Sequence, residues 1–334
     1  MPPLIAPDDQ DIDLTIIVPV HDAAGHLEPL VQTFLEIEGT SCQIILVDDC
    51  STDGSAAEIA RLAAANPQVT GLYQTANLGA GQARNLAWPH ARGRYCLFFD
   101  ADDHLHGEVI APTLAIMDAE PDIDTAMFAY RYEREESASF TAMSLSDQQS
   151  FDAILKGADR VIAPLEDVAR LLRFTNYPWN KIIRTAHFQN IGLRHGSTKV
   201  NNDILGHWYS LLFARNIMVV NQVICTHIVH PHGSNLTNRF TSDRLQMFDA
   251  LEETHDLLRA HPALQQRYGH HFWGLVHTLI RWARPRIAPE IRLEFESRYR
   301  DLISHIDLGV FSRMRTSHSP QIANHFVKDL IGLV

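Results

Sequence analysis

The 334-residue sequence has few cysteines, and they are not spaced for a metal site or a disulfide framework. The four cysteines are scattered along the chain and form no CxxC pair. This spacing argues against both a zinc knuckle and a disulfide scaffold. We therefore expect a protein of the reducing cytoplasm. The cysteines are Cys42, Cys50, Cys96 and Cys225.

Long apolar runs and a basic leader are also lacking. No apolar stretch approaches the roughly 20 residues that a membrane-spanning helix needs. The sequence starts MPPLIAPDD, which is acidic and has neither the basic nor the apolar region of a signal peptide. We accordingly expect no transmembrane segment and a cytoplasmic location, with a peripheral position at the inner face of the membrane left open.

Basic residues are outnumbered, with 28 Lys and Arg against 40 Asp and Glu, and the formal net charge is -12. Nucleic-acid binding needs basic surface, so we expect no nucleic-acid partner. A hydrophobic fraction of 46% with 20% charged residues is typical of a folded chain. The length allows one large domain or two ordinary ones.

Short apolar runs alternate with helical patterns from residue 14 to residue 130. This β-α-β spacing predicts an α/β fold with a mostly parallel sheet and helices on both faces. We expect strands at 14–18, ended by Pro19, and at 43–47, 69–73, 95–99 and 125–130, and helices at 27–37, 55–65, 81–88 and 109–119.

The rest of the chain divides into a mixed region and a helical one. Residues 131–163 are polar and indicate an insertion or a mobile loop. Residues 165–174 and 202–213 look helical, and 219–229 look like a strand. From 239 to 334 the pattern is all helical, with helices expected at 244–259, 265–282 and 291–306. We therefore predict an α/β domain at 1–238 and a helical C-terminal extension.

Polar residues follow each of the first four expected strands, where open α/β sheets bind their ligands. Asp and Ser after a strand also commonly cap the next helix, and a lone Asp48-Asp49 pair is more often a solvated turn. Clustered carboxylates repel one another, which favours a hard divalent cation that also holds a diphosphate. The segments are Pro19 to Asp22, Asp48 to Gly54, Asn77 to Asn85 and Asp100 to Asp103.

These segments together resemble the ordered signature of family 2 glycosyltransferases of the GT-A fold. The resemblance spans about residues 14–238, with a nucleotide-sugar half at 14–130 and an acceptor half at 164–238. The motifs are Val18-Pro19-Val20, Val47 to Gly54, Asn77-Leu78-Gly79 with Ala83-Arg84-Asn85, Phe99 to Asp103, Trp179-Asn180-Lys181, Asn202-Asp203 and His230 to Asn235.

The resemblance implies a role for each matched residue. Pro19, Val20 and His21 would line the nucleobase pocket, Asp49 would accept from the base N–H, Arg84 would approach the base or diphosphate, and Asp100 would hold the ribose. Asp102 and His232 would bind Mn²⁺ or Mg²⁺, His230, Trp179 and Lys181 would lie on the diphosphate or acceptor side, and Asp203 would be the catalytic base.

Two residues depart from the family pattern. Asp22 follows His21 where relatives often have Asn, and Asn202 precedes Asp203 where Glu is commoner. Without an acidic neighbour, Asp203 should ionise more easily. The alternative role for Asp203 is to cap the helix that follows it.

The expected activity is transfer of a sugar, with inversion, from a nucleotide donor to an acceptor hydroxyl. The resemblance implies a UDP-sugar donor, a glycan or lipid-linked acceptor, and surface-polysaccharide synthesis. A haloacid-dehalogenase-type phosphatase is one alternative, although that motif wants Thr or Val where the chain has His104. A catalytically silent nucleotide-sugar binding protein is another. The sequence does not fit a Rossmann dehydrogenase, because no GxGxxG motif follows the first expected strand.

Histidines and the C-terminal helices leave further alternatives. His227, His230 and His232 lie close in sequence, but with only Cys225 nearby we do not expect a dedicated zinc site. The apolar stripe from Phe272 to Trp282, which arginines follow, favours packed core over docking on an anionic membrane. A dimer contact through these helices stays open.

Overall fold

The computed structural model describes residues 12–134, 139–229 and 241–332. Its centre is one mixed sheet with the strand order β3-β2-β1-β4-β9-β6-β10-β5. Two further strands join this sheet, because β7 pairs with β6 and β8 pairs with β10. The strands are β1 Leu14–Val20, β2 Cys42–Asp48, β3 Val69–Tyr73, β4 Tyr95–Phe98, β5 His104–Leu105, β6 Ile123–Arg134, β7 Ser139–Thr141, β8 Arg160–Ala163, β9 Lys181–Arg184 and β10 Asn216–Val229.

Strand direction determines which strand ends lie together. β3, β2, β1 and β4 pair in parallel, and so do β6 and β10. β9 lies antiparallel between β4 and β6, so both of these groups point the same way. The carboxyl ends of β1 to β4, β6 and β10 therefore meet at one edge of the sheet, which confirms the predicted α/β fold with a mostly parallel sheet.

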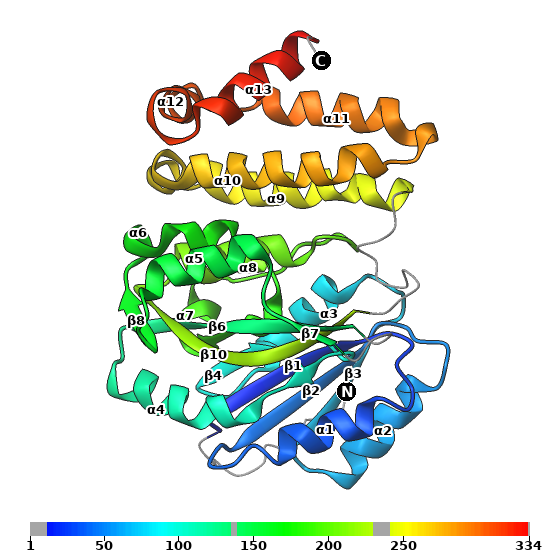
Figure 1. Cartoon of the computed structure of the whole chain (residues 1–334). Helices are drawn as coiled ribbons and strands as arrows, with labels where there is room; N and C mark the ends of the chain where they lie inside the picture. The colour runs from blue at the N-terminus through cyan, green and yellow to red at the C-terminus, as the bar shows by residue number, and fades with distance from the viewer. Residues whose placement is uncertain (1–11, 135–138, 230–240, 333–334) are drawn as a thin grey trace.

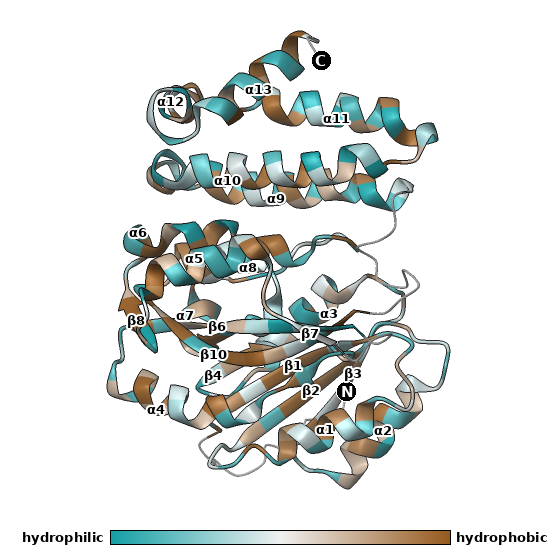
Figure 2. Cartoon of the chain, viewed as in Figure 1, coloured by the Kyte–Doolittle hydropathy of each residue, from teal (hydrophilic) through white to brown (hydrophobic). Residues whose placement is uncertain are grey.

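Helices cover both faces of the sheet because successive strand residues point to opposite sides. On β1, Ile16 packs in the cluster with α1 and α2, and Ile17 packs in the cluster with α3. Figure 2 shows that β1 and β2 are largely apolar, whereas α1 and α2 carry both apolar and polar residues. The helices are α1 Leu27–Leu35, α2 Ser55–Ala65, α3 Ala80–Ala87, α4 Ile110–Ala119, α5 Leu145–Leu155, α6 Leu165–Val168, α7 Thr185–Asn190 and α8 Asp203–Leu212.

The C-terminal region is helical as predicted, and it stacks on the α/β part as further layers (Figure 1). Phe272 and Trp273 on α10 are buried, and Trp208 of α8 lies 5.8 Å from Phe272, centroid to centroid. The apolar stripe of α10 is therefore packed core. Across the described residues, none of the helices is long and apolar enough to span a membrane. The helices are α9 Gln246–Arg259, α10 Pro262–Ala283, α11 Arg292–Ser304, α12 Leu308–Arg313 and α13 Pro320–Ile331.

Some sequence predictions of local structure are wrong. β1 does not end at Pro19 but runs to Val20. The region expected to be an insertion or a mobile loop, 131–163, contains the end of β6, β7, α5 and β8. Asp147 on α5 is buried and accepts hydrogen bonds from Tyr130 and Thr175, so distant residues stabilise this segment. The sequence does not predict β5, β9 or α7, and it gives no separate bounds for α12 and α13, which lie in the region predicted to be helical.

Candidate active site

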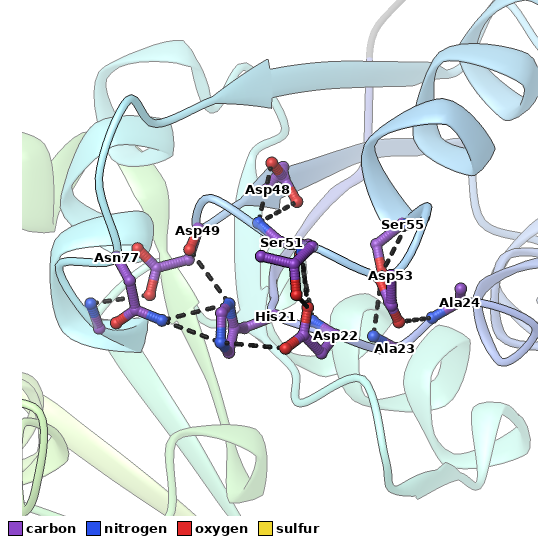
Figure 3. Close-up of polar contacts among 12 residues, drawn as sticks. His21, Asp22, Ala23, Ala24, Asp48, Asp49, Ser51, Asp53, Ser55 and Asn77 are labelled. Carbon is purple, nitrogen blue, oxygen red and sulfur yellow. Dashed lines mark hydrogen bonds and ion pairs between the residues drawn. The ribbon is translucent and has the colours of Figure 1, made fainter.

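The loops after β1, β2 and β3 are joined through His21 (Figure 3). Nδ1 of His21 lies 3.2 Å from the Asp49 carbonyl oxygen, and Nδ2 of Asn77 lies 3.0 Å from Nε2 of the same ring. A proton on Nδ1 satisfies both contacts, because the ring then donates to the carbonyl and accepts from the amide. His21 therefore lies among three strand ends, and its role in a nucleobase pocket stays a prediction.

The Asp49 carboxylate holds the loop that follows β3. Its Oδ1 accepts from the Leu78 N–H at 2.7 Å, and its Oδ2 accepts from the Gly79 N–H at 2.8 Å. Val20 and Pro19 are buried at the end of β1, and the Val20 carbonyl accepts from the Asp49 N–H at 2.8 Å. Asp49 thus positions backbone at this edge. Its contact with a nucleobase stays a prediction.

Asp22, one of the two departures from the family pattern, also turns toward a neighbouring loop. It has a positive φ of 48°, and its Oδ1 accepts from the Thr52 N–H at 2.7 Å. Oδ2 of Asp22 lies 3.5 Å from the His21 ring. The Asp22 carboxylate therefore connects the loop after β1 to the loop after β2.

Arg84 on α3 connects the two halves of the α/β part. It is almost fully buried, and its guanidinium donates to Oδ1 of Asp100 at 2.5 Å and to Oδ1 of Asn202 at 2.9 Å. Asp100 follows β4, and Asn202 directly precedes α8. This bridge fixes the start of α8 beside the end of β4. Contact of Arg84 with a base or diphosphate stays a prediction.

Asp203 is the first residue of α8, at the edge that Arg84 bridges. The N-cap of α8 is Asn202, and no side-chain bond caps the helix, so the interpretation of Asp203 as a cap is wrong. Burial raises the pKa of Asp203 to about 6, and Arg84 and Lys181 oppose this only in part. Burial thus outweighs the missing acidic neighbour that was expected to ease ionisation. A carboxyl group with this pKa suits a general base near neutral pH.

Lys181 and Trp179, the two predicted acceptor-side residues, are buried. Nζ of Lys181 donates to Oδ1 of Asn180 at 2.5 Å and to the Tyr177 carbonyl at 2.6 Å, and burial lowers its pKa to about 7. The Trp179 ring is fully buried and stacks on Tyr177 with centroids 4.4 Å apart. Contact of either residue with a diphosphate or an acceptor stays a prediction.

A small cavity adjoins the Asp203 carboxyl group. It has a volume of about 10 Å³, room for roughly one water molecule. Lys181, His195 and His207 also line it. Burial holds the pKa of both histidines well below its ordinary value, so both rings are neutral.

Asp102 and Asp103 follow Asp100 but differ in exposure. Asp102 is exposed, whereas Asp103 is buried and its Oδ1 accepts from the Ile228 N–H at 3.0 Å and contacts Nδ1 of His227 at 2.8 Å. Burial raises the pKa of Asp103 to about 6. Burial alone would lower the pKa of His227, but Asp103 raises it above its ordinary value. Asp103 lies in the sequence motif after β4, but no local pattern indicates His227 as its partner.

The proposed metal site has only part of its ligands among the described residues. His230 and His232 lie outside the described residues, so the structure does not place them. In the ranges that the structure describes, no three His, Cys, Asp or Glu side chains are arranged to hold a metal ion. Exposed Asp102 fits Mg²⁺ or Mn²⁺ as one carboxylate ligand, because such ions often take one or two carboxylates plus substrate phosphates and water.

The helical region holds the segment that leads to Asp203. Glu253 on α9 accepts from the Ser197 N–H at 3.1 Å, and Gln246 accepts from the Lys199 N–H at 2.8 Å. Arg244 donates to Oδ1 of Asn201 at 3.3 Å. Sequence reasoning missed these contacts, because nothing local to residues 195–202 marks the partner helix.

The chain is similar in sequence to several known proteins. The chain is 31% identical over 172 residues to the uncharacterized glycosyltransferase YibD of Escherichia coli, covering 51% of this chain and 48% of that protein. It is 30% identical over 135 residues to TuaG of Bacillus subtilis, a putative teichuronic acid biosynthesis glycosyltransferase, covering 40% and 48%. The matches thus span about half the length of these curated relatives.

Among solved structures, Staphylococcus aureus TarS 1-349 in complex with UDP-GlcNAc is similar with a TM-score of 0.73 at 17% identity, covering 96% of this chain and 91% of that chain. At this identity the likeness concerns the fold. The model of the family "Glycosyl transferase family 2" matches residues 15–197, which include Asp49, Arg84, Asp100 and Asp102 and stop before Asp203. The chain belongs to glycosyl transferase family 2.

Proposed function

We propose that this protein is a metal-dependent, inverting glycosyltransferase with a UDP-sugar donor. The bridge from Arg84 to Asp100 and Asn202 carries the proposal, because it fixes a nucleotide-side carboxylate and the start of α8 in one site. TarS has been solved with UDP-GlcNAc, and a mannosyltransferase of Pyrobaculum calidifontis with GDP-Man and Mn²⁺. These complexes support a nucleotide-sugar donor and the choice of ion to test.

On the donor side, the residues after β1 to β4 bind and orient the nucleotide. Pro19 to His21 and Asp49 face the base, Asp100 holds the ribose, and Arg84 keeps Asp100 in place. Asp102, with His232, would hold Mn²⁺ or Mg²⁺. When bound, the ion supplies positive charge that offsets the charge of the leaving diphosphate.

On the acceptor side, Asp203 takes the proton of the attacking hydroxyl. The bond between the anomeric carbon and the diphosphate oxygen breaks, and its electron pair leaves with the nucleoside diphosphate. The acceptor oxygen bonds to the same carbon from the opposite face, and a single displacement inverts that centre. The buried surroundings of Asp203 raise its pKa to about 6, so the base is ionised at neutral pH yet basic enough to accept a proton.

The acceptor we propose is a glycan or lipid-linked glycan of the cell surface. The name of TuaG, and that of TarS as a poly(ribitol-phosphate) β-N-acetylglucosaminyltransferase, support a surface polymer. We retain the division at residue 238, the cytoplasmic location with peripheral membrane contact, and a dimer through the C-terminal helices as proposals.

A thermal-shift screen tests the donor. Nucleoside diphosphate sugars are added with and without Mn²⁺, and we expect UDP-sugars with Mn²⁺ to raise the melting temperature most. No stabilisation by any donor would count against the proposal. Turnover of the Asp203→Asn variant separates an enzyme from a silent nucleotide-sugar binding protein, because only an enzyme loses turnover.

A further inference from the structure

Charge is distributed unevenly between the two parts of the chain. Residues 1–238 carry 15 Lys and Arg against 29 Asp and Glu, a net charge of -14, whereas residues 239–334 carry 13 against 11, a net charge of +2. The acidic excess therefore lies entirely in the α/β part. An anionic ligand that approaches the molecule is attracted more strongly to the helical part.

An open hollow of about 540 Å³ in the helical part gathers several of these arginines. It lies where α10 leads into α11, and it is lined by Arg281, Arg284, Pro285, Arg292 and Glu296. Three guanidinium groups thus face one space together with a single carboxylate. Guanidinium is the side chain best suited to phosphate, because its planar fork can donate two parallel hydrogen bonds.

Arg284 is the fixed member of this group. Its Nε lies 2.8 Å from Oε1 of Glu296, its Nη1 lies 3.6 Å from Oδ1 of Asp329, and its guanidinium carbon lies 4.8 Å from the Tyr299 ring centroid. Two carboxylates and an aromatic ring therefore hold Arg284 in one place and balance its charge.

Arg281 and Arg292 are the members available to a ligand. Both side chains are exposed, and within the described ranges neither forms a hydrogen bond or an ion pair. Their positive charges therefore have no direct partner in this part of the protein. The hollow therefore combines the immobilised Arg284 with Arg281 and Arg292, whose guanidinium N–H donors are available to a ligand.

Aromatic and polar contacts connect the hollow to the active-site segment. Trp282 follows Arg281, and the guanidinium carbon of Arg244 lies 5.2 Å from the Trp282 ring centroid. Arg244 in turn donates to Asn201, two residues before Asp203. Figure 1 shows the turn between α10 and α11 at the same end of the helical layers as the start of α9. The hollow therefore lies at the end of the extension that contacts the start of α8.

We propose that this hollow binds a phosphate group of the acceptor substrate and so helps to present its hydroxyl to Asp203. The assignment of the ligand to the acceptor rests on the proposed glycosyltransferase function. A membrane surface fits less well, because Glu290, Glu294 and Glu296 lie among the arginines in sequence. Polybasic membrane-binding segments instead concentrate several Lys and Arg.

Calorimetric titration of the full chain with tripolyphosphate, at constant ionic strength, tests the site. Arg281→Gln/Arg292→Gln is compared with wild type and with Arg300→Gln, an exposed arginine of α11 outside the hollow. We expect the double variant to lose one binding site or to bind at least tenfold more weakly, and Arg300→Gln to match wild type. Equal binding by all three proteins would overturn the proposal.

Two further measurements identify the source of the phosphate. Flotation with phosphatidylglycerol vesicles, against phosphatidylcholine vesicles, should recruit wild type and the double variant equally. Recruitment of wild type alone by phosphatidylglycerol would overturn the acceptor assignment in favour of a membrane surface. The thermal shift with UDP-GlcNAc and Mn²⁺ should be the same in the double variant and wild type. Its absence from both would count against the donor proposal, whereas the tripolyphosphate result judges the hollow independently.

Discussion

The strand-end loops of the nucleotide half and the segment around Asp203 are held in different ways. His21 contacts both Asp49 and Asn77, so the residues of the sequence motifs position the motifs themselves. Asp203 depends on Arg84 from α3 and on a segment that α9 holds through Glu253. The comparison teaches that contacts among strand-end loops can be specified locally, while the environment of Asp203 requires the assembled fold.

The largest effect expected within the nucleotide half comes from loss of the proposed metal ligand. Asp102→Ala should lower kcat on the order of 10²–10³-fold, because it removes the carboxylate proposed to hold the ion that stabilises the leaving diphosphate. Release of UDP in the presence of an acceptor measures it. Asp152→Ala, an exposed carboxylate on α5, is the control and should keep full activity. A fully active Asp102→Ala enzyme would remove this residue from the site.

Arg84→Met should break the connection between the two regions. We expect the free energy of unfolding to fall by about 3 kcal/mol, because Asp100 and Asn202 lose a buried, charged partner. Arg61→Met removes an exposed ion pair with Glu28 and should cost at most about 1 kcal/mol. Urea denaturation compares the two, and equal losses would show that the Arg84 bridge contributes no more than a surface contact.

The pH profile should distinguish the base from its neighbours. Asp203 must be ionised to accept a proton, and its pKa is raised to about 6, so kcat/KM should fall about tenfold per pH unit below 6 and level off above it. Asp103 also has a pKa raised to about 6. If Asp203 causes the decrease of kcat/KM below pH 6, the Asp103→Asn variant should show the same decrease. If the decrease disappears in Asp103→Asn, it belongs to Asp103.

The smallest expected effect tests the local hydrogen bonds of the nucleotide half. Asp49→Asn replaces one acceptor oxygen with a donor, so the N–H of Leu78 or Gly79 loses its partner. The free energy of unfolding should fall by about 1 kcal/mol, measured by urea denaturation. Affinity for UDP should fall as well if Asp49 also binds the base. Unchanged stability would mean that other contacts hold the loop.

Periodic, locally encoded elements could be predicted from the sequence. The predicted bounds of α2 and β3, 55–65 and 69–73, agree with the structure, because a clear apolar pattern and turn residues mark them. The segment 131–163 could not be predicted, because Asp147 is polar and becomes buried only through Tyr130 and Thr175. β9 was missed because it is four residues long and begins with a buried lysine, Lys181.

For the site, the motif residues could be named but not their pairing. His21 and Asn77 lie together as strand-end reasoning expects, since the ends of parallel strands meet at one edge. The contact of Asp103 with His227 spans 124 residues, and that of Arg84 with Asn202 spans 118. No local pattern encodes such contacts, because they follow from the order of strands in the sheet.

The most direct test of the central claim is Asp203→Asn measured in two assays on the same protein. The account predicts that transfer to an acceptor falls on the order of 10²–10⁴-fold while UDP-sugar binding by calorimetry stays within about twofold of wild type. Transfer at the wild-type rate would contradict the assignment of Asp203 as the base that takes the acceptor proton.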